Sequence, residues 1–230
     1  LSIARLRRQP REALALLLAA GWTNVAFVLA VIEGEVVRVL LLFYLSPIWA
    51  VLLGRWLLHE ALGWHTWLLL GLGMCGALVM LWDPAVGRVP LNRADLLAVS
   101  AGLAFALNNV MTRRITSLAV REKTYIAWLG VVVVSLLVVS LWSPHVPSAP
   151  AVAWWATVAL GVFGFMLSTL AVVYGVTHMP IQRSAVIMLF ELVVGAVTAW
   201  WLAGELISPR EWVGGALILS AALVAILREE

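Results

Sequence analysis

An apolar run with a charged residue at each end constrains this chain more than any other feature. It extends from Arg38 to Glu60 and reads RVLLLFYLSPIWAVLLGRWLLHE. A helix needs roughly 20 mainly apolar residues to cross the hydrocarbon layer of a bilayer, so this run is long enough to span it. The whole chain is 63% hydrophobic and 12% charged, whereas soluble domains are about 25% charged. The sequence therefore predicts an integral membrane protein.

Apolar runs of similar length recur along the chain, separated by short polar loops. Together they predict an all-α integral membrane fold with eight transmembrane helices. The expected spans are residues 13–32, 36–58, 64–82, 95–112, 124–142, 151–177, 183–204 and 211–227. Proline-rich loops such as SPHVPSAP, at 143–150, cannot continue a helix and so divide the spans.

The basic residues favour one side of the predicted membrane. An even number of spans places both termini on one side, and eleven of the 15 Lys and Arg residues fall on that side. Cytoplasmic loops of membrane proteins carry such an excess of basic residues. The sequence therefore predicts a multi-pass protein of the cell inner membrane or plasma membrane, with both termini cytoplasmic.

The run at 38–60 recurs 145 residues later as RSAVIMLFELVVGAVTAWWLAGE, at 183–205. Without a gap, Arg38 aligns with Arg183 and Glu60 aligns with Glu205. Five predicted spans lie between the two arginines, an odd number, so the second copy crosses the membrane in the opposite direction. Inverted repeats of this kind are typical of secondary transporters.

The repeat divides the chain into two units, residues 1–84 and 85–230. The second unit has five predicted spans, whereas the first has only three, which correspond to the last three of a complete unit. We therefore expect a ten-helix inverted-repeat bundle, 5+5, whose first two helices precede residue 1. A native protein with eight spans remains the alternative.

Several local motifs resemble the EamA-type repeat of the drug/metabolite transporter superfamily. They are Ser46-Pro47 in mid-span, LLHEAL at 57–62, GLGMCGALVML at 71–81 and LFELVVGAVTAWWLAGELI at 189–207. The resemblance implies two five-helix halves with both termini cytoplasmic. One departure is that Leu192 stands in the second copy where the first copy has Pro47. We therefore expect the second copy to lack the helix break that this proline can introduce.

Glu191 is the most informative single residue, because it lies well inside a predicted span. A carboxylic acid at the centre of a bilayer costs roughly 2.5–3.5 kcal/mol on insertion scales. Glu191 either binds an amine of a substrate or couples transport to protons, or it is protonated and bonded to a neighbouring helix. The sequence leaves these interpretations open.

Amides and a proline inside other spans complete the candidate site. Asn24, Asn108 and Asn109 can bind a polar substrate or join helices, and the second role is favoured. Tyr44 and Ser46 adjoin Pro47, so this segment either lines a pocket or forms a simple kink. The predicted substrate-binding residues are Asn24, Tyr44, Ser46, Asn108, Asn109 and Glu191, with Pro47 as a hinge.

The charged residues at the span ends have simpler expected roles. Glu60 and Glu205 are expected to fix loops at helix ends. Arg38 and Arg183 are expected to extend toward lipid phosphates, as long basic side chains do near the membrane surface. An inward orientation of either arginine would instead favour an anionic substrate.

Motifs for catalysis, metal binding and nucleotide binding are missing from the sequence. It has no HExxH, CxxC, GxGxxG or GxxxxGK[ST] pattern, so we expect no catalytic residue, metal or cofactor. No dense basic face with interleaved aromatic residues occurs, and this argues against binding of nucleic acid.

The function predicted from the sequence is secondary transport. We expect export of a small polar metabolite, such as an amino acid or a related compound, by alternating access. The expected partners are the lipid bilayer and this metabolite, and proton coupling and homodimer formation stay open. An intramembrane enzyme and a non-transporting membrane interaction protein are the alternatives.

Overall fold

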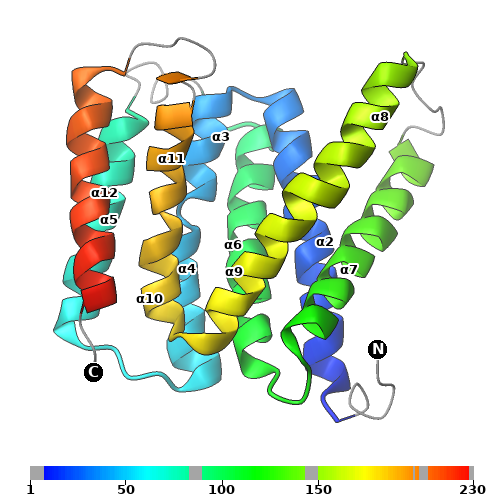
Figure 1. Ribbon diagram of the computed structural model, residues 1–230, viewed down its shortest axis with the longest axis horizontal. Coiled ribbons are helices and arrows are strands. Elements are labelled where there is room, and N and C mark those ends of the chain that lie inside the picture. The colour runs from blue at the N-terminus through cyan, green and yellow to red at the C-terminus, as the bar shows by residue number, and fades with distance from the viewer. Residues whose placement is uncertain (1–7, 83–89, 143–149, 199, 202–206, 228–230) are drawn as a thin grey trace.

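The computed structural model describes residues 8–82, 90–142, 150–198, 200–201 and 207–227, and within these ranges it contains helices and no strand (Figure 1). The segments are α2 (Pro10–Glu33), α3 (Val36–Phe43), α4 (Ser46–Leu53), the π-helical η1 (Gly54–Leu58), α5 (Trp64–Met80), α6 (Arg93–Arg114), α7 (Val120–Trp142), α8 (Ala151–Ala159), the π-helical η3 (Leu160–Phe165), α9 (Met166–His178), α10 (Ile181–Met188), α11 (Phe190–Thr198) and α12 (Pro209–Leu227).

The predicted spans coincide with these helices or with chains of two or three helical segments. In the described ranges, seven helical stretches are long and apolar enough to cross a membrane. The stretch Trp64–Met80 is apolar but shorter, at 17 residues. The prediction of an all-helical, multi-pass membrane protein is therefore confirmed.

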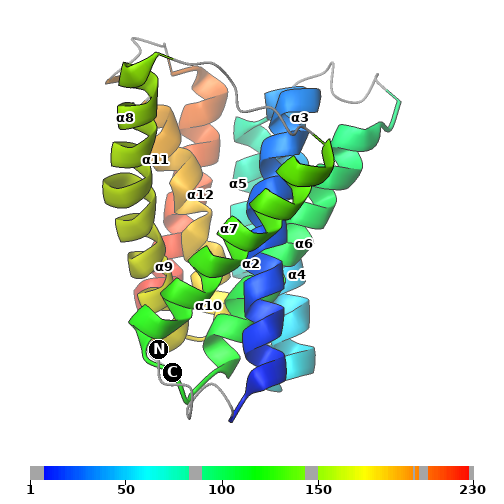
Figure 2. The same ribbon diagram turned by 90° about the vertical axis from the view of Figure 1, so that its right-hand side faces the viewer.

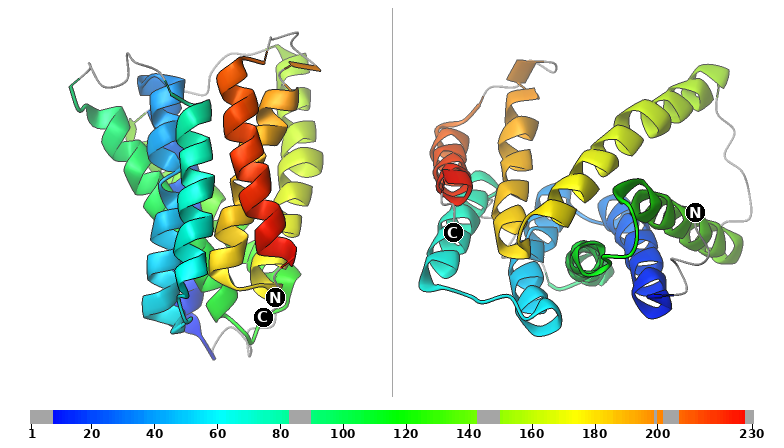
Figure 3. Two further views of the ribbon diagram at one scale, coloured as in Figure 1. Left: turned by 90° about the vertical axis from the view of Figure 1, so that its left-hand side faces the viewer. Right: turned by 60° about the horizontal axis from the view of Figure 1, so that its bottom comes forward.

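The helices form two groups that meet in the middle of the molecule. In the first, called here the α2 group, α2 packs against α6 and α7, and α6 packs against α3 and α4. In the second, the α12 group, α12 packs against α5, α10 and α11. Figure 3 shows α5 and α12 side by side. Because α10 also packs against α4, it joins the two groups.

Two helical segments at the centre run in opposite directions. In Figure 1 the chain descends through α3 and α4 and ascends through α10 and α11. We call the end of the bundle where α2 begins and α12 ends the lower end, as both figures draw it (Figures 1 and 2). α3 and α11 therefore lie in the upper half of the bundle, and α4 and α10 lie in the lower half.

Both central segments are interrupted near their midpoints. α3 ends at Phe43 and α4 begins at Ser46, while α10 ends at Met188 and α11 begins at Phe190. The expectation that the second copy lacks a helix break is therefore wrong.

The second break arises without proline. The N–H of Leu189 donates to the carbonyl of Val186 at 3.2 Å, and the N–H of Leu192 donates to the carbonyl of Leu189 at 3.1 Å. These bonds join residues three apart, as in a 3₁₀ turn, instead of four apart. The helix therefore tightens around Leu189, and neither the residue type nor the local sequence pattern predicts this.

A buried ion pair joins α3 to α6 at the upper end. Arg38 Nε donates to Asp95 Oδ1 at 2.6 Å, and Arg38 Nη2 donates to Asp95 Oδ2 at 2.7 Å. The two side chains are only 7% and 3% exposed. Asp95 also accepts the N–H of Asn92 at 2.9 Å as part of a capping box at the start of α6. The expectation that Arg38 extends toward lipid is wrong, because Asp95 neutralises it inside the protein.

Asp95→Asn should lower the free energy of unfolding by about 3–5 kcal/mol, because it leaves the charge of Arg38 buried without its partner. Unfolding in mixed detergent micelles measures this loss. The double variant Arg38→Met with Asp95→Leu removes both charges and should recover most of the stability. A double variant as unstable as Asp95→Asn would contradict a role for charge burial.

Candidate functional site

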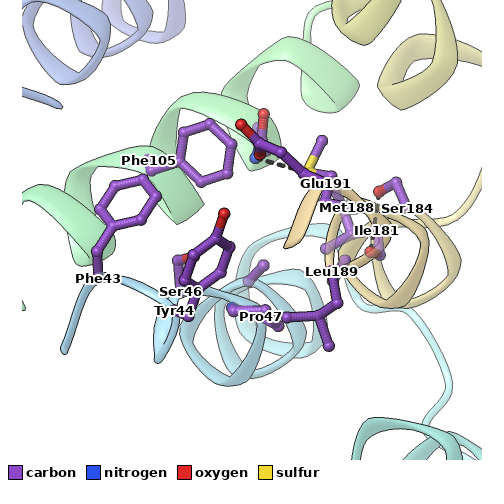
Figure 4. A pocket seen from close by; sticks show the side chains of 13 residues that line it. Phe43, Tyr44, Ser46, Pro47, Phe105, Ile181, Ser184, Met188, Leu189 and Glu191 are labelled. Atoms are coloured by element: carbon purple, nitrogen blue, oxygen red, sulfur yellow. Dashed lines mark hydrogen bonds between the residues drawn. The ribbon is translucent and has the colours of Figure 1, made fainter. Parts of the chain in front are cut away.

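A pocket lies between the two helix breaks, at the boundary of the two helix groups (Figure 4). The α2 group contributes Phe43, Tyr44, Ser46, Pro47, Ala50, Phe105 and Asn109, and the α12 group contributes Ile181, Ser184, Ala185, Met188, Leu189 and Glu191. The free space inside is about 10 Å³, roughly enough for one water molecule. The two groups therefore lie in close contact at the site.

Pro47 explains the break on the α2 side. It has no N–H, so it cannot donate to the carbonyl of the residue four positions earlier, Phe43. That carbonyl lies against Gly102 of α6, where an added Cβ would be 2.7 Å from the oxygen. Glycine at this position allows the backbone of α6 to approach the break closely.

Leu189 lies at the break on the α12 side, between α10 and α11. Its side chain is fully buried, and an added Cβ at Gly73 of α5 would be 2.7 Å from Leu189 Cδ1. At each break the chain therefore contacts a glycine of a neighbouring helix, through the Phe43 carbonyl on one side and through the Leu189 side chain on the other. Such interior contacts keep an interrupted helix away from lipid, which would not tolerate it.

Aromatic rings line one part of the pocket. The ring centroid of Phe43 lies 4.8 Å from that of Phe27, 5.4 Å from that of Phe105 and 5.7 Å from that of Tyr44. Figure 4 shows Phe43, Tyr44 and Phe105 on the same side of the pocket. Such a cluster offers a large apolar surface with edge and face contacts for another ring.

Polar groups reach the pocket from α6 and α11. Asn109 Nδ2 donates to Met188 Sδ at 3.6 Å, a weak acceptor that leaves most of the amide's bonding capacity unused. Glu191 lies in the first turn of α11, where the helix dipole favours a negative charge. Among the described residues, none forms a hydrogen bond or ion pair with Glu191. Its carboxyl group is therefore available to a ligand or to a proton.

The structure brings five of the seven predicted site residues together. Tyr44, Ser46, Pro47, Asn109 and Glu191 all line the pocket. Asn24 does not, because it lies on an exposed face of α2, where its Nδ2 donates to the carbonyl of Ala20 at 3.0 Å. Asn108 does not line the pocket either, and its Oδ1 is buried without a hydrogen-bond partner among the described residues.

The pocket also contains residues that the sequence analysis did not single out. Phe105 precedes Asn109 by four positions, and Ser184 precedes Met188 by four. Residues four apart lie on one helix face, so helical spacing from Asn109 could have identified Phe105. No such signal existed for Leu189, which resembles every other leucine of the spans.

The described part of the chain contains no cluster of three His, Cys, Asp or Glu side chains that could hold a metal ion. Glu205, a predicted loop-fixing residue, lies outside the described residues. The chemistry available at the pocket is therefore that of aromatic rings, one side-chain amide, three hydroxyl groups and one carboxylic acid. These groups can bind and release a small molecule.

Comparison with known proteins identifies a family. The sequence pattern of the EamA-like transporter family matches residues 4–82 and 92–227. A solved crystal structure superposes with a TM-score of 0.76 over 99% of this chain and 79% of its own, at 21% sequence identity. At this identity the superposition supports the fold alone.

Two relatives have descriptions that name a function. An uncharacterized transporter of Archaeoglobus fulgidus is 25% identical over 224 residues, which cover 95% of this chain and 77% of that protein. A riboflavin transporter of Rhizobium johnstonii is 28% identical over 190 residues, which cover 80% of this chain and 59% of that protein. The match thus spans less than two thirds of the riboflavin transporter.

Gly102→Ala should destabilise the protein by about 1–3 kcal/mol, as overpacking of a tight interior does, because the added methyl group would collide with the carbonyl of Phe43. Gly71→Ala is the matched control, since an added Cβ there has nothing within 4 Å. Melting temperatures of both purified variants measure the difference. Equal melting temperatures would show that the close approach at Gly102 is unimportant.

Proposed function

The chain belongs to the EamA-like transporter family, and we propose that it moves a small polar metabolite across the membrane by alternating access. One observation carries the proposal: the pocket lies where two oppositely directed, interrupted helices meet, one from each predicted unit. Secondary transporters commonly bind their substrates between such discontinuous helices, near the middle of the membrane.

The side chains of the pocket support a substrate with both an apolar and a polar part. Phe43, Tyr44 and Phe105 provide ring surfaces, and Asn109 and Glu191 provide an amide and a carboxyl group. An amino acid or a related compound has an amine for Glu191 and a side chain for the rings. Because one relative is named as a riboflavin transporter, riboflavin belongs in the same set of test compounds.

We infer that the lower end faces the cytoplasm, and we propose export as the direction of transport. The lower ends of α6 and α7 carry Arg113, Arg114, Arg121 and Lys123, whereas the upper end of α6 carries Arg93. An excess of basic residues favours the cytoplasmic side. This orientation places the protein in the inner or plasma membrane with both termini cytoplasmic.

We infer in addition a 5+5 inverted repeat. In the α2 span, which packs on α6 and α7, 44% of the apolar 18-residue window is buried inside the protein. In its repeat counterpart, Ala151–His178, only 6% of such a window is buried. In a symmetric arrangement two helices equivalent to α6 and α7 would cover α8, η3 and α9. The coding sequence upstream of Leu1 tests this: two apolar spans there would support it, and a start codon without them would contradict it.

Transport into proteoliposomes, with and without a proton gradient, tests the proposed function. Glu191→Gln keeps the shape of the side chain and removes its charge, so loss of a charged hydrogen bond of about 1.5–3 kcal/mol should weaken uptake of an amine substrate roughly tenfold or more. Unchanged transport and unchanged dependence on the proton gradient would exclude both roles of Glu191.

A pair of amide variants tests the location of the site. Asn109→Ala removes a group that lines the pocket, and one hydrogen bond of about 1 kcal/mol corresponds to a roughly fivefold loss of affinity. Asn24→Ala removes an amide outside the pocket and should leave the apparent affinity for substrate unchanged. Competition for uptake of a labelled substrate measures the apparent affinity of both variants. A larger loss of affinity in Asn24→Ala than in Asn109→Ala would place the site elsewhere.

A further inference from the structure

Charged side chains hold the turn between α9 and α10 at the lower end of the bundle. Arg113 Nη1 donates to the carbonyl of Thr177 at 2.6 Å, and Lys123 Nζ donates to the Thr177 hydroxyl at 3.2 Å. On the other side of the turn, Glu60 Oε2 accepts the N–H of Ile181 at 3.1 Å. The end of α9 is therefore held by Arg113 and Lys123, and the start of α10 is held by Glu60.

The backbone before Glu60 directs its carboxylate to this place. His59 has a φ of 57°, in the left-handed region, and reverses the chain directly after η1. Asparagine, aspartate and histidine adopt this conformation more readily than most residues. The side chain of Ile181 packs against Gly54, where an added Cβ would be 3.2 Å from Ile181 Cγ2. The loop and the start of α10 thus fit closely together.

Glu60 also faces a cation of the other helix group. Arg113 Nε lies 3.8 Å from Glu60 Oε1, and the two side chains are 31% and 17% exposed. Burial raises the pKa of the Glu60 carboxyl, while the hydrogen bond from Ile181 and the charge of Arg113 limit the rise. Glu60 thus links Arg113, on α6 of the α2 group, to the N-terminus of α10 in the α12 group.

Two other ion pairs of the described chain lie within the α2 group. Arg38 and Asp95 join α3 to α6, and the pair Arg114–Glu12, at 3.8 Å, joins α6 to α2. These contacts stabilise the α2 group without connecting it to the α12 group. The contacts of Glu60 differ because they cross the boundary on which the pocket lies.

The contacts of Glu60 lie directly below the pocket. Ile181 donates its N–H to Glu60 and is also one of the residues that line the pocket. Ala50 of α4 lines the pocket from the other group and belongs to the same buried cluster as Ile181. Separation of α10 from α4 at this point would open the pocket toward the lower end.

We propose that Glu60, with Arg113 and the N-terminus of α10, forms a latch that keeps the lower end of the pocket closed. The proposal rests on the alternating access inferred above and adds a residue that controls it. Release of the carboxylate from Ile181 frees α10 to move away from α4. Glu60 is thus a positioning residue, since it lies outside the pocket and acts through α10.

Cysteine labelling tests the latch without a substrate. Cys75 is the single cysteine of the chain, so Cys75→Ala gives a cysteine-free background, and Ala50→Cys places a reporter in the pocket. A membrane-impermeant maleimide is added to either face of oriented vesicles. Glu60→Ala should accelerate labelling from the lower face by roughly ten- to a hundredfold, because it removes a charged hydrogen bond, and labelling from the upper face should not increase.

Glu12→Ala is the matched control, because it removes an ion pair of equal length at the same end but within one helix group. It should leave the labelling rate unchanged. If Glu60→Ala is not monodisperse, Glu60→Gln decides, since it keeps an acceptor for Ile181 and should give a smaller acceleration on the same face. Equal rates in the Glu60 and Glu12 variants, or acceleration from the upper face alone, would overturn the latch.

The outcomes separate the latch from the proposed function. Faster labelling in a protein that moves none of the test compounds would contradict the proposed transport and support the latch as a contact that closes the pocket. Unchanged labelling in a protein that transports normally would support the function and reject the latch.

Discussion

A bilayer supplies no water to unpaired backbone groups, so an interrupted helix is tolerated only where other protein covers it. This constraint determines where the site of this protein lies. The carbonyl that Pro47 leaves unpaired is covered by α6 at Gly102, and the second break is covered by α5 through the buried Leu189. The two breaks come together in the interior, and the pocket forms between them. The irregular backbone and the pocket are thus consequences of the same packing.

Charged residues serve different purposes at the two ends of the bundle. At the upper end, Arg38 and Asp95 form a buried bidentate pair within the α2 group, which favours a single arrangement of α3 and α6. At the lower end, Glu60 makes longer contacts that cross between the groups. Longer and more exposed contacts are weaker. In the proposed mechanism this difference is useful, because a boundary that opens in every transport cycle cannot be held as strongly as a group that moves as one body.

Most polar residues of the pocket could be identified from the sequence, because a polar group inside an apolar span is conspicuous. Glu191, Asn109 and the Ser46–Pro47 pair were identified in this way, and they line the pocket. Asn24 was equally conspicuous but lies on the exposed face of α2. Depth in the membrane follows from position within a span, whereas the direction in which a side chain points depends on which neighbours the helix acquires.

The sequence by itself determined the membrane class, the spans and the break at Pro47, because hydrophobicity, run length and the missing N–H of proline are local properties. Only the tertiary structure decided the rest. Arg38 is neutralised by Asp95, which is 57 positions away, and Glu60 binds a helix end that is 121 positions away. The side chain of Leu189, at the second break, packs against Gly73 of α5, which is 116 positions earlier in the chain. Such contacts depend on which helices become neighbours, and that is settled by packing of the whole chain.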